Sequence, residues 1–236
     1  MASVGERIEE LARRYELPAG AGEKLVALLR MVAEEPIAIT SVREPERALD
    51  VHVADSLVGL EVSAVRGAAT IADLGAGGGF PGLVLAIARP EAQVRLVESV
   101  AKKCDFLRRA AEECGLGNVE VVCARAEEWR EGLDANDVVT ARALAPLNVL
   151  VEYAAPLLRE GGTLVAWKGR RDPAEEADGS AAAEIMGLEP AEPLRVDPFP
   201  EADERHLYLY SKVRPTPPGY PRRPGMARKR PLRAST

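Results

Sequence analysis

Long apolar runs are missing from this chain of 236 residues. No stretch reaches the roughly 18 to 20 apolar residues that a membrane-spanning helix needs. The first seventeen residues mix charged side chains with helical apolar spacing, which is not typical of a secretory signal. We therefore predict a cytoplasmic protein that makes no contact with membranes.

Cysteine is scarce, and the few cysteines present lack the spacing of a metal site. Cys104, Cys114 and Cys123 form no CxxC pair and have no histidine at the spacing of a zinc ligand. Such a sparse, odd-numbered set is typical of reduced thiols in a cytosolic protein. The sequence thus predicts neither a metal centre nor a disulfide framework.

Acidic residues are absent from the last part of the chain, although they outnumber basic residues overall. The net charge is −6, yet nine Lys and Arg and no Asp or Glu occur from Arg205 onward. An acidic body with a basic, proline-rich tail has two interpretations. The tail contacts a polyanion, or it is a solvated and disordered segment.

Two patterns of hydrophobic spacing divide the chain. Apolar residues from Val4 to about Val65 recur at helical spacing, which predicts a small helical cap. After that region, short β-branched runs alternate with helical stretches such as 82–88 and 125–129, the pattern of βαβ units and a parallel sheet. The runs at 193–200 and 205–213 have no helix between them and predict an antiparallel addition.

These patterns predict an α/β fold with a doubly wound, mostly parallel sheet of seven strands and helices on both faces. The predicted parts are a helical N-terminal cap in residues 1–66, a sheet domain in 67–214, and a basic, proline-rich tail in 215–236.

The stretch "IADLGAGGGFPGLVLAI" (71–87) places five glycines within eight residues, just after an aspartate. In an open α/β sheet, ligands bind beyond the carboxyl ends of the strands, so the first βα turn is the expected site. Missing side chains let the main chain approach a ligand, and N–H groups at the helix start point toward it. The predicted site residues of this turn are Asp73, Gly75, Gly77, Gly79 and Phe80.

Two kinds of ligand fit this turn. The spacing of Gly77, Gly79 and Gly82 matches the dinucleotide fingerprint of oxidoreductases. Asp73 and the glycines after it instead match the Asp-x-Gly-x-Gly-x-Gly turn of S-adenosylmethionine-dependent methyltransferases. Glu98 ends the next predicted strand, where a carboxylate accepts hydrogen bonds from ribose hydroxyls in either case. A carboxylate on the first strand suits a cationic cofactor, which favours methyl transfer over hydride transfer.

Several further segments follow the turn in a fixed order. They include "VESVAKKCDFLR", "VVTARALAPL" and "RHLYLYSKVRPTPPGYPRRPG". Together with the turn, they resemble the bacterial family of 16S rRNA guanine-N7 methyltransferases called RsmG or glucose-inhibited division protein B. The resemblance begins at about Ile39. It implies a class I, Rossmann-like methyltransferase domain in 67–214, S-adenosyl-L-methionine as cofactor, and 16S rRNA or the 30S subunit as substrate.

The resemblance also implies roles for individual residues. Gly75 and Phe80 correspond to cofactor-contacting residues of the first loop, and Ala126 and Glu127 to the pair beside the adenine. Arg142 corresponds to an arginine at the carboxyl edge of the sheet that faces the reaction centre. We predict Arg142 to be both catalytic and cofactor-binding, holding the methionine carboxylate or guanine O6 with its planar fork.

The sequence departs from the family pattern at one position of the predicted helical cap, just before Ile39. Ala38 stands where the family usually has asparagine, so we do not assign this segment the family's polar contacts. His52 and Asp55 lie three residues apart on a predicted helix. This spacing is typical of an ordinary polar pair, and we leave His52 out of the predicted site.

Methylation of guanine N7 makes modest chemical demands. N7 has a free lone pair, so in-line geometry and a suitable electrostatic field matter more than a general base. The sequence accordingly offers no nucleophile–base pair. No cysteine follows a proline, as the covalent route to pyrimidine C5 would require.

The resemblance favours RNA contact for the basic tail, in which prolines hold the chain extended. Basic residues on phosphates supply salt-sensitive affinity without reading sequence. We expect the tail to be separable from the cofactor site. The predicted RNA contacts are Arg222, Arg223, Arg228, Lys229 and Arg230, joined by Lys102 and Lys103 at the sheet edge.

Two other functions are compatible with the sequence. One is a dinucleotide-dependent oxidoreductase, and the other is a non-catalytic RNA-binding module that keeps the sheet. Cofactor binding distinguishes the first from a methyltransferase, and methyl transfer to rRNA distinguishes the second.

Overall fold

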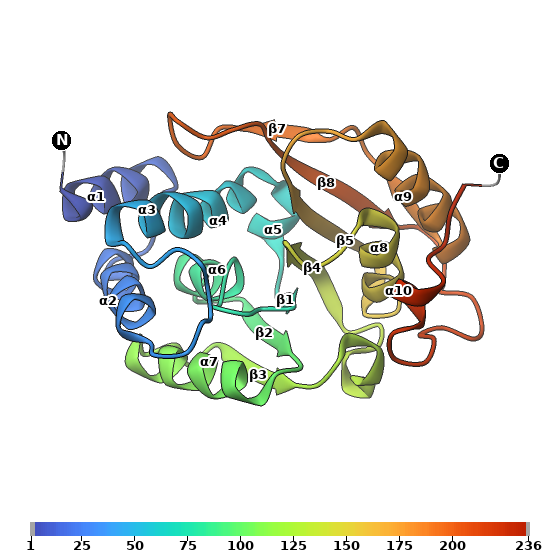
Figure 1. Ribbon diagram of the computed structural model, residues 1–236, viewed down its shortest axis with the longest axis horizontal. Helices are drawn as coiled ribbons and strands as arrows, with labels where there is room; N and C mark the ends of the chain where they lie inside the picture. The colour runs from blue at the N-terminus through green and yellow to red at the C-terminus, as the bar shows by residue number, and fades with distance from the viewer. Residues whose placement is uncertain (1–2, 235–236) are drawn as a thin grey trace.

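A computed structural model describes residues 3–234 of the chain. Residues 1, 2, 235 and 236, which belong to the predicted cap and tail, lie outside the described residues. An eight-stranded sheet runs through the centre (Figure 1). Its strands are β1 (Thr70–Leu74), β2 (Gln93–Glu98), β3 (Val119–Cys123), β4 (Asn136–Arg142), β5 (Leu158–Lys168), β6 (Leu188–Pro190), β7 (Leu194–Val196) and β8 (Arg205–Lys212).

The strand order confirms a doubly wound, mostly parallel sheet. Neighbours follow the order β3-β2-β1-β4-β5-β8-β6, and β7 pairs with β8 beside this path. The first five strands are parallel, while β8 runs antiparallel to β5, β6 and β7. The predicted antiparallel addition is therefore present. The strand count exceeds the predicted seven because β8 pairs with two separate three-residue strands, β6 and β7.

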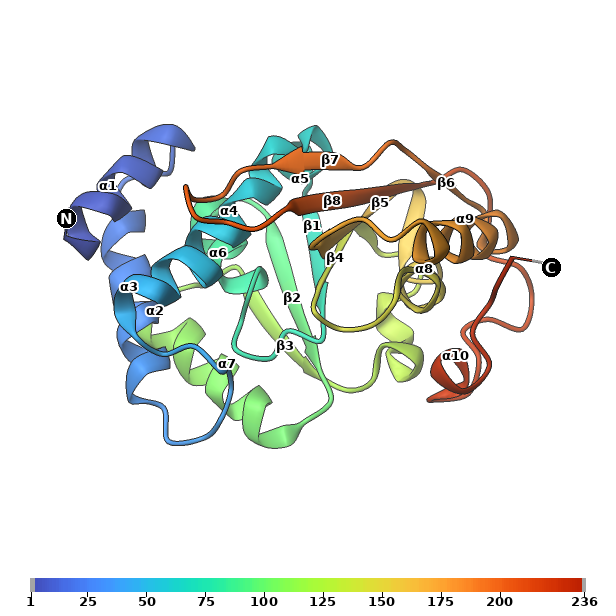
Figure 2. The ribbon, with the colours of Figure 1, turned by 45° about the horizontal axis from the view of Figure 1, so that its top comes forward.

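Helices cover both faces of the sheet (Figures 1 and 2). The first face carries α6 (Gly82–Ala88) and α7 (Ala101–Glu113), and the second carries α8 (Leu147–Ala154), α9 (Pro173–Met186) and the short α10 (Met226–Lys229). Within residues 3–234, no helix combines the length and the apolar character needed to cross a bilayer.

The helix predicted at 125–129 is wrong. The chain forms only two 3₁₀ turns there, η3 (Ala126–Glu128) and η4 (Arg130–Gly132). Trp129 adopts extended backbone angles between the two turns and is buried. A segment this short does not offset the cost of helix nucleation, and burial of the indole ring favours the break.

The N-terminal part is helical, as predicted. α1 (Val4–Arg14) begins with a capping box between Ser3 and Glu6. The other elements are α2 (Ala21–Glu34), α3 (Pro45–Ala48), η1 (Leu49–Ala54), α4 (Asp55–Leu57), η2 (Val58–Glu61) and α5 (Ser63–Gly67). From α3 to η2 the chain is helical without a break, and this run contains one π-helical turn, η1.

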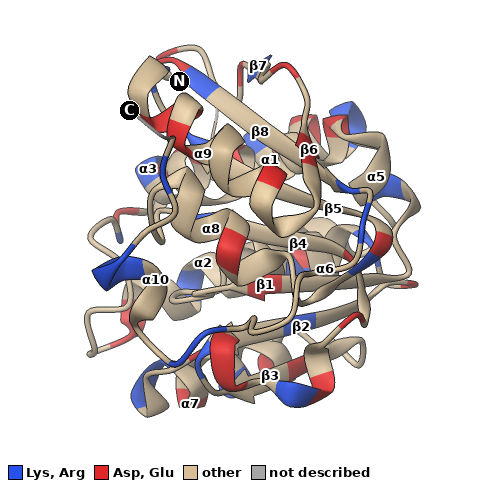
Figure 3. Ribbon diagram, turned by 90° about the vertical axis from the view of Figure 1, so that its right-hand side faces the viewer, with Lys and Arg blue, Asp and Glu red and all other residues tan. Residues whose placement is uncertain are grey.

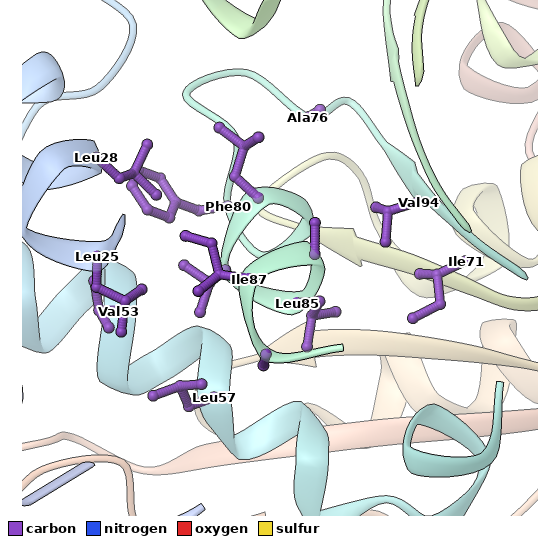
Figure 4. Packing of buried hydrophobic residues seen from close by; sticks show 14 of the residues in the cluster. Leu25, Leu28, Val53, Leu57, Ile71, Ala76, Phe80, Leu85, Ile87 and Val94 are labelled. Atoms are coloured by element: carbon purple, nitrogen blue, oxygen red, sulfur yellow. The ribbon is translucent and has the colours of Figure 1, made fainter. Parts of the chain in front are cut away.

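The cap and the sheet share one hydrophobic core. Leu25 and Leu28 of α2 both face the side of α6 that carries Ile87, and Phe80 lies in the same cluster (Figure 4). Leu57 of α4 lies in the same cluster. Because these side chains lie in one cluster, unfolding of the cap would expose the apolar outer side of α6 and α7. The predicted boundary at residues 66 and 67 stays a prediction about the chain's organisation.

The prediction of three reduced thiols is wrong. Cys104 and Cys123 form a disulfide, with their Cα atoms 5.9 Å apart, and only the buried Cys114 is a free cysteine among the described residues. The parallel register pairs Cys123 with Glu98 at the end of β2, and α7 begins three residues after that strand. The sulfur atoms therefore meet through strand pairing, which cysteine spacing does not reveal.

The shared core predicts that a cap mutation destabilises the whole protein. Leu28 is fully buried, and Leu28→Ala is expected to lower the free energy of unfolding by about 2–5 kcal/mol. Val26, 47% exposed on the same helix, provides the control. Val26→Ala should change the free energy of unfolding by less than about 0.5 kcal/mol. Urea denaturation followed by circular dichroism measures both. A cap that unfolds in a separate, earlier transition would contradict the shared core.

Candidate active site

A cavity of about 390 Å³ lies at the carboxyl ends of the first parallel strands. This volume falls within the range of small-molecule sites, roughly 300–1,000 Å³. Its walls include four of the nine residues predicted to bind the cofactor: Gly75, Glu98, Ala126 and Glu127. The structure thus brings together the ends of β1 and β2 and the turn after β3.

The glycine turn shapes this cavity through a missing side chain. Gly75 has a φ of 67°, and a Cβ atom there would lie 2.6 Å from Leu144 Cδ1 on the opposite wall. The turn also uses its own N–H groups. Gly75 donates to the Val97 carbonyl at 2.8 Å, and Gly77 donates to Glu98 Oε2 at 3.0 Å. The turn is therefore fixed by hydrogen bonds to the end of β2, and Gly77 and Gly79 lie outside the cavity walls.

Glu98 is held in place by backbone donors. Its side chain is buried, and besides the bond from Gly77 its Oε1 atom accepts from the N–H of Val100 at 2.9 Å. Each carboxylate oxygen retains a second acceptor site. Glu98 therefore presents a fixed, negatively charged acceptor at the cavity wall, as ribose hydroxyls require.

Asp73 lies beneath the turn, away from the cavity walls. It is 1% exposed and accepts hydrogen bonds from the Thr140 hydroxyl at 2.8 Å and from the Gly82 N–H at 3.0 Å. Burial raises the pKa of Asp73 to about 6, while these two hydrogen bonds oppose the shift. Asp73 therefore joins β1 to β4 and to the start of α6. The direct cofactor contact predicted for it stays untested.

A second group of side chains, the cap–edge cluster, lies where β4 meets the N-terminal cap. It consists of Arg142, Phe80, His52 and Asp55. Arg142 Nη1 donates to the Asp55 carboxylate at 2.8 Å and to the Val51 carbonyl at 2.7 Å. Its guanidinium lies 5.6 Å from the centre of the Phe80 ring. The imidazole of His52 stacks on that ring, with centroids 4.5 Å apart and an interplanar angle of 12°.

His52 belongs to this cluster, although the sequence analysis left it out. Its Nε2 atom lies 3.0 Å from the Thr40 hydroxyl and 3.0 Å from the Val42 carbonyl. Its Nδ1 atom lies 3.4 Å from Arg142 Nη2. Burial lowers the pKa of His52 to about 4, and the charge of Arg142 adds to the shift. His52 is therefore a neutral side chain through which the cap contacts Arg142.

The expected polar pair between His52 and Asp55 is replaced by pairing with arginine. Asp55 lies between Arg142 and Arg205 of β8, whose Nε atom is 3.3 Å from the other carboxylate oxygen. The π-helical η1 carries His52 and ends directly before Asp55. The only sequence signal for this arrangement was the start of the family resemblance at about Ile39, because nothing in the local sequence links the cap to β4.

Ten further residues line the cavity that were not predicted as cofactor contacts. They include Leu144, Tyr153 of α8, Arg228 of α10 and Lys103, which was predicted to contact RNA. Ala143 adopts a φ of 53°, rare for a residue with a side chain, and this turn directs the chain after β4 along the cavity. Among residues 3–234, no three or more His, Cys, Asp or Glu side chains are grouped as a metal site would need.

Comparison with known sequences gives consistent matches over most of the chain. The GidB family profile, described as rRNA small subunit methyltransferase G, matches residues 22–207. The ribosomal RNA small subunit methyltransferase G of Rubrobacter xylanophilus is 46% identical over 201 residues, covering 83% of this chain and 77% of that protein. The protein of the same name from Deinococcus radiodurans is 41% identical over 216 residues, covering 89% of this chain and 83% of its own length.

Solved structures support the fold. A SAM-dependent methyltransferase from Aquifex aeolicus superimposes with a TM-score of 0.53 at 16% identity, covering 70% of this chain and 93% of that one. This similarity confirms the predicted class I, Rossmann-like architecture.

The neutral His52 predicts a specific response of stability to pH. Its pKa is about 4 in the folded protein against 6.5 in the unfolded chain, so the unfolded state binds the proton first on acidification. Stability from this group is complete above pH 6.5 and is lost as the pH falls toward 4. Between pH 7 and 5, wild type should lose about 2 kcal/mol more than His52→Gln.

Urea denaturation at both pH values measures this difference. Asp73, with its pKa raised to about 6, has the opposite pH dependence, but it is present in both proteins and cancels. Between pH 7.5 and 8.5 the two proteins should respond alike, which is the control. Equal losses of stability at pH 5 would contradict a neutral, buried imidazole.

Proposed function

This chain belongs to the GidB family, rRNA small subunit methyltransferase G, and we propose that it transfers a methyl group from S-adenosylmethionine to N7 of a guanine in 16S rRNA. The observation that carries this proposal is the cavity formed by Gly75, Glu98, Ala126 and Glu127 at the carboxyl edge of the sheet. It lies where open α/β sheets bind nucleotide ligands.

The residues present fit this cofactor. Glu98 offers a fixed carboxylate for ribose hydroxyls and would repel a ribose phosphate. Ala126 and Glu127 flank the space for the adenine. Gly75 leaves room that a Cβ atom would take from Leu144. These features fit the adenosine part of S-adenosylmethionine, and the bound cofactor would supply the electrophilic methyl group.

The chain's own contribution is positioning and electrostatics. Guanine N7 attacks with its free lone pair, so no side chain needs to remove a proton. Arg142 holds its guanidinium at the edge of the sheet through Asp55 and Val51. We assign Arg142 the role of orienting the methionine carboxylate or guanine O6, because its planar donors match either acceptor.

The substrate is 16S rRNA or the 30S subunit, and we propose that the protein acts in the cytoplasm. Arg223, Lys229 and Arg230 are exposed and form no ion pair with any acidic side chain in the described part of the chain. Figure 3 shows Lys and Arg along α10. These three are the tail residues best suited to bind phosphates, because the guanidinium of Arg228, which is also exposed, already donates to the Leu144 carbonyl. Arg222 is less suited, because both oxygens of the buried Glu152 already accept from its guanidinium.

Substitution of Arg142 tests the proposed reaction. Arg142→Ala is expected to lower kcat at least about 100-fold, since one preorganised donor at a reaction centre is worth that much or more. The assay measures transfer of labelled methyl groups to unmodified 16S rRNA or 30S particles. Arg108→Ala, which removes an exposed arginine of α7, is the control and should keep normal turnover.

Two further measurements make the Arg142 result interpretable. The melting temperature of Arg142→Ala shows whether the protein still folds once Asp55 has lost this partner. Stabilisation of wild type by S-adenosylhomocysteine, and none by NAD(P), distinguishes a methyltransferase from an oxidoreductase. Near-normal methylation by a folded Arg142→Ala protein would remove Arg142 from the mechanism.

The exposed basic residues give a separate prediction about RNA binding. Replacing Arg223, Lys229 and Arg230 together with alanine should weaken rRNA binding. It should also reduce the slope of log K against log salt concentration by about 2 to 3, because each phosphate contact contributes about 0.7–0.9. Filter binding from 50 to 300 mM salt, roughly, covers the useful range. Arg195→Ala, on the exposed edge strand β7, is the control. An unchanged slope would exclude the tail from the RNA interface.

A further inference from the structure

The C-terminal segment 219–233, here called the strap, is packed onto the second face of the sheet. Arg222 forms a two-pronged ion pair with Glu152 of α8, which is only 3% exposed. Ala227 of the strap is buried in the hydrophobic cluster on this face. Asn148 Nδ2 donates to the Leu232 carbonyl at 2.7 Å. The strap is therefore an ordered part of the fold, and the interpretation as a disordered tail is wrong for these residues.

The strap also contacts the cavity. The Gly225 N–H donates to Glu127 Oε1 at 2.9 Å, so the strap holds the carboxylate of a residue beside the predicted adenine position. Arg228 Nη2 donates to the Leu144 carbonyl at 2.9 Å, which holds the guanidinium at the cavity wall formed by Leu144. Arg228 and Tyr153 both line the cavity.

The chemistry of Arg228 suits an adenosine ligand. A guanidinium stacks on aromatic faces and donates to ring nitrogens and hydroxyl oxygens. Its stem adds apolar contact with a purine. The hydrogen bond to Leu144 restricts its rotamers before a ligand arrives, so less entropy is lost on binding.

We propose that the strap forms a wall of the cofactor site and that Arg228 binds the adenosine part of S-adenosylmethionine. This inference rests on the proposed function, because it takes the cofactor from there. It reverses the expectation that the basic tail is separable from cofactor binding. The exposed basic residues of the strap then divide, with Arg228 at the cavity and Arg223, Lys229 and Arg230 available to RNA.

Isothermal titration calorimetry with S-adenosylhomocysteine and no RNA tests this assignment. Arg228→Ala and Arg228→Met should each raise Kd about tenfold. Arg228→Met keeps the apolar stem and carries the test if Arg228→Ala melts at a lower temperature than wild type. Arg233→Ala is the matched control, because Arg233 is an exposed arginine of the same strap outside the cavity walls. It should stay within about twofold of wild type.

The outcomes separate this inference from the proposed function. If wild type gives no heat with S-adenosylhomocysteine, the proposed function fails and this inference with it. If wild type binds and the folded Arg228 variants match Arg233→Ala, the proposed function stands and the strap is no part of the cofactor site.

Discussion

The buried carboxylate of Asp73 is the constraint on which the rest of the site depends. It receives the Gly82 N–H and the Thr140 hydroxyl, so one side chain fixes β1, β4 and the start of α6 relative to one another. The glycine turn lies between these anchors, and the N–H groups of Gly75 and Gly77 donate to Val97 and Glu98 at the end of β2. Its shape is therefore set before any ligand binds, and such preorganisation reduces the entropy lost on binding.

The N-terminal cap completes the reaction edge of the sheet. Arg142 ends β4, Asp55 belongs to the cap and Arg205 begins β8, yet their charged groups meet in one largely buried arrangement. Burying charges costs solvation free energy that close pairing must offset. Removing one member would leave another charge without compensation, so the position of Arg142 depends on the cap being folded. His52 strengthens this link, because it packs against Phe80 of the glycine turn as well.

Short stretches of sequence predicted those elements whose structure depends on neighbouring residues alone. The glycine turn and the helix at 82–88 followed from turn chemistry and apolar spacing, and the structure has α6 at those residues. The direction of the Asp73 side chain could not be predicted, because it depends on Thr140 from a distant strand. The Cys104–Cys123 disulfide was missed for the same reason, since strand register creates that contact.

The basic tail shows why charge counts alone mislead about partners. Arg222 and Arg223 are adjacent and chemically identical, but Arg222 pairs with the buried Glu152, seventy residues earlier, while Arg223 is exposed. Nothing within the tail distinguishes them. Arg228 lies at the cavity a few residues further on. A run of basic residues thus divides into an anchor, a cavity wall and a free surface. The anchor contributes little to long-range attraction of a polyanion, because its charge is already neutralised by its carboxylate partner. Arg228 and the free surface carry charges that no carboxylate pairs among the described residues.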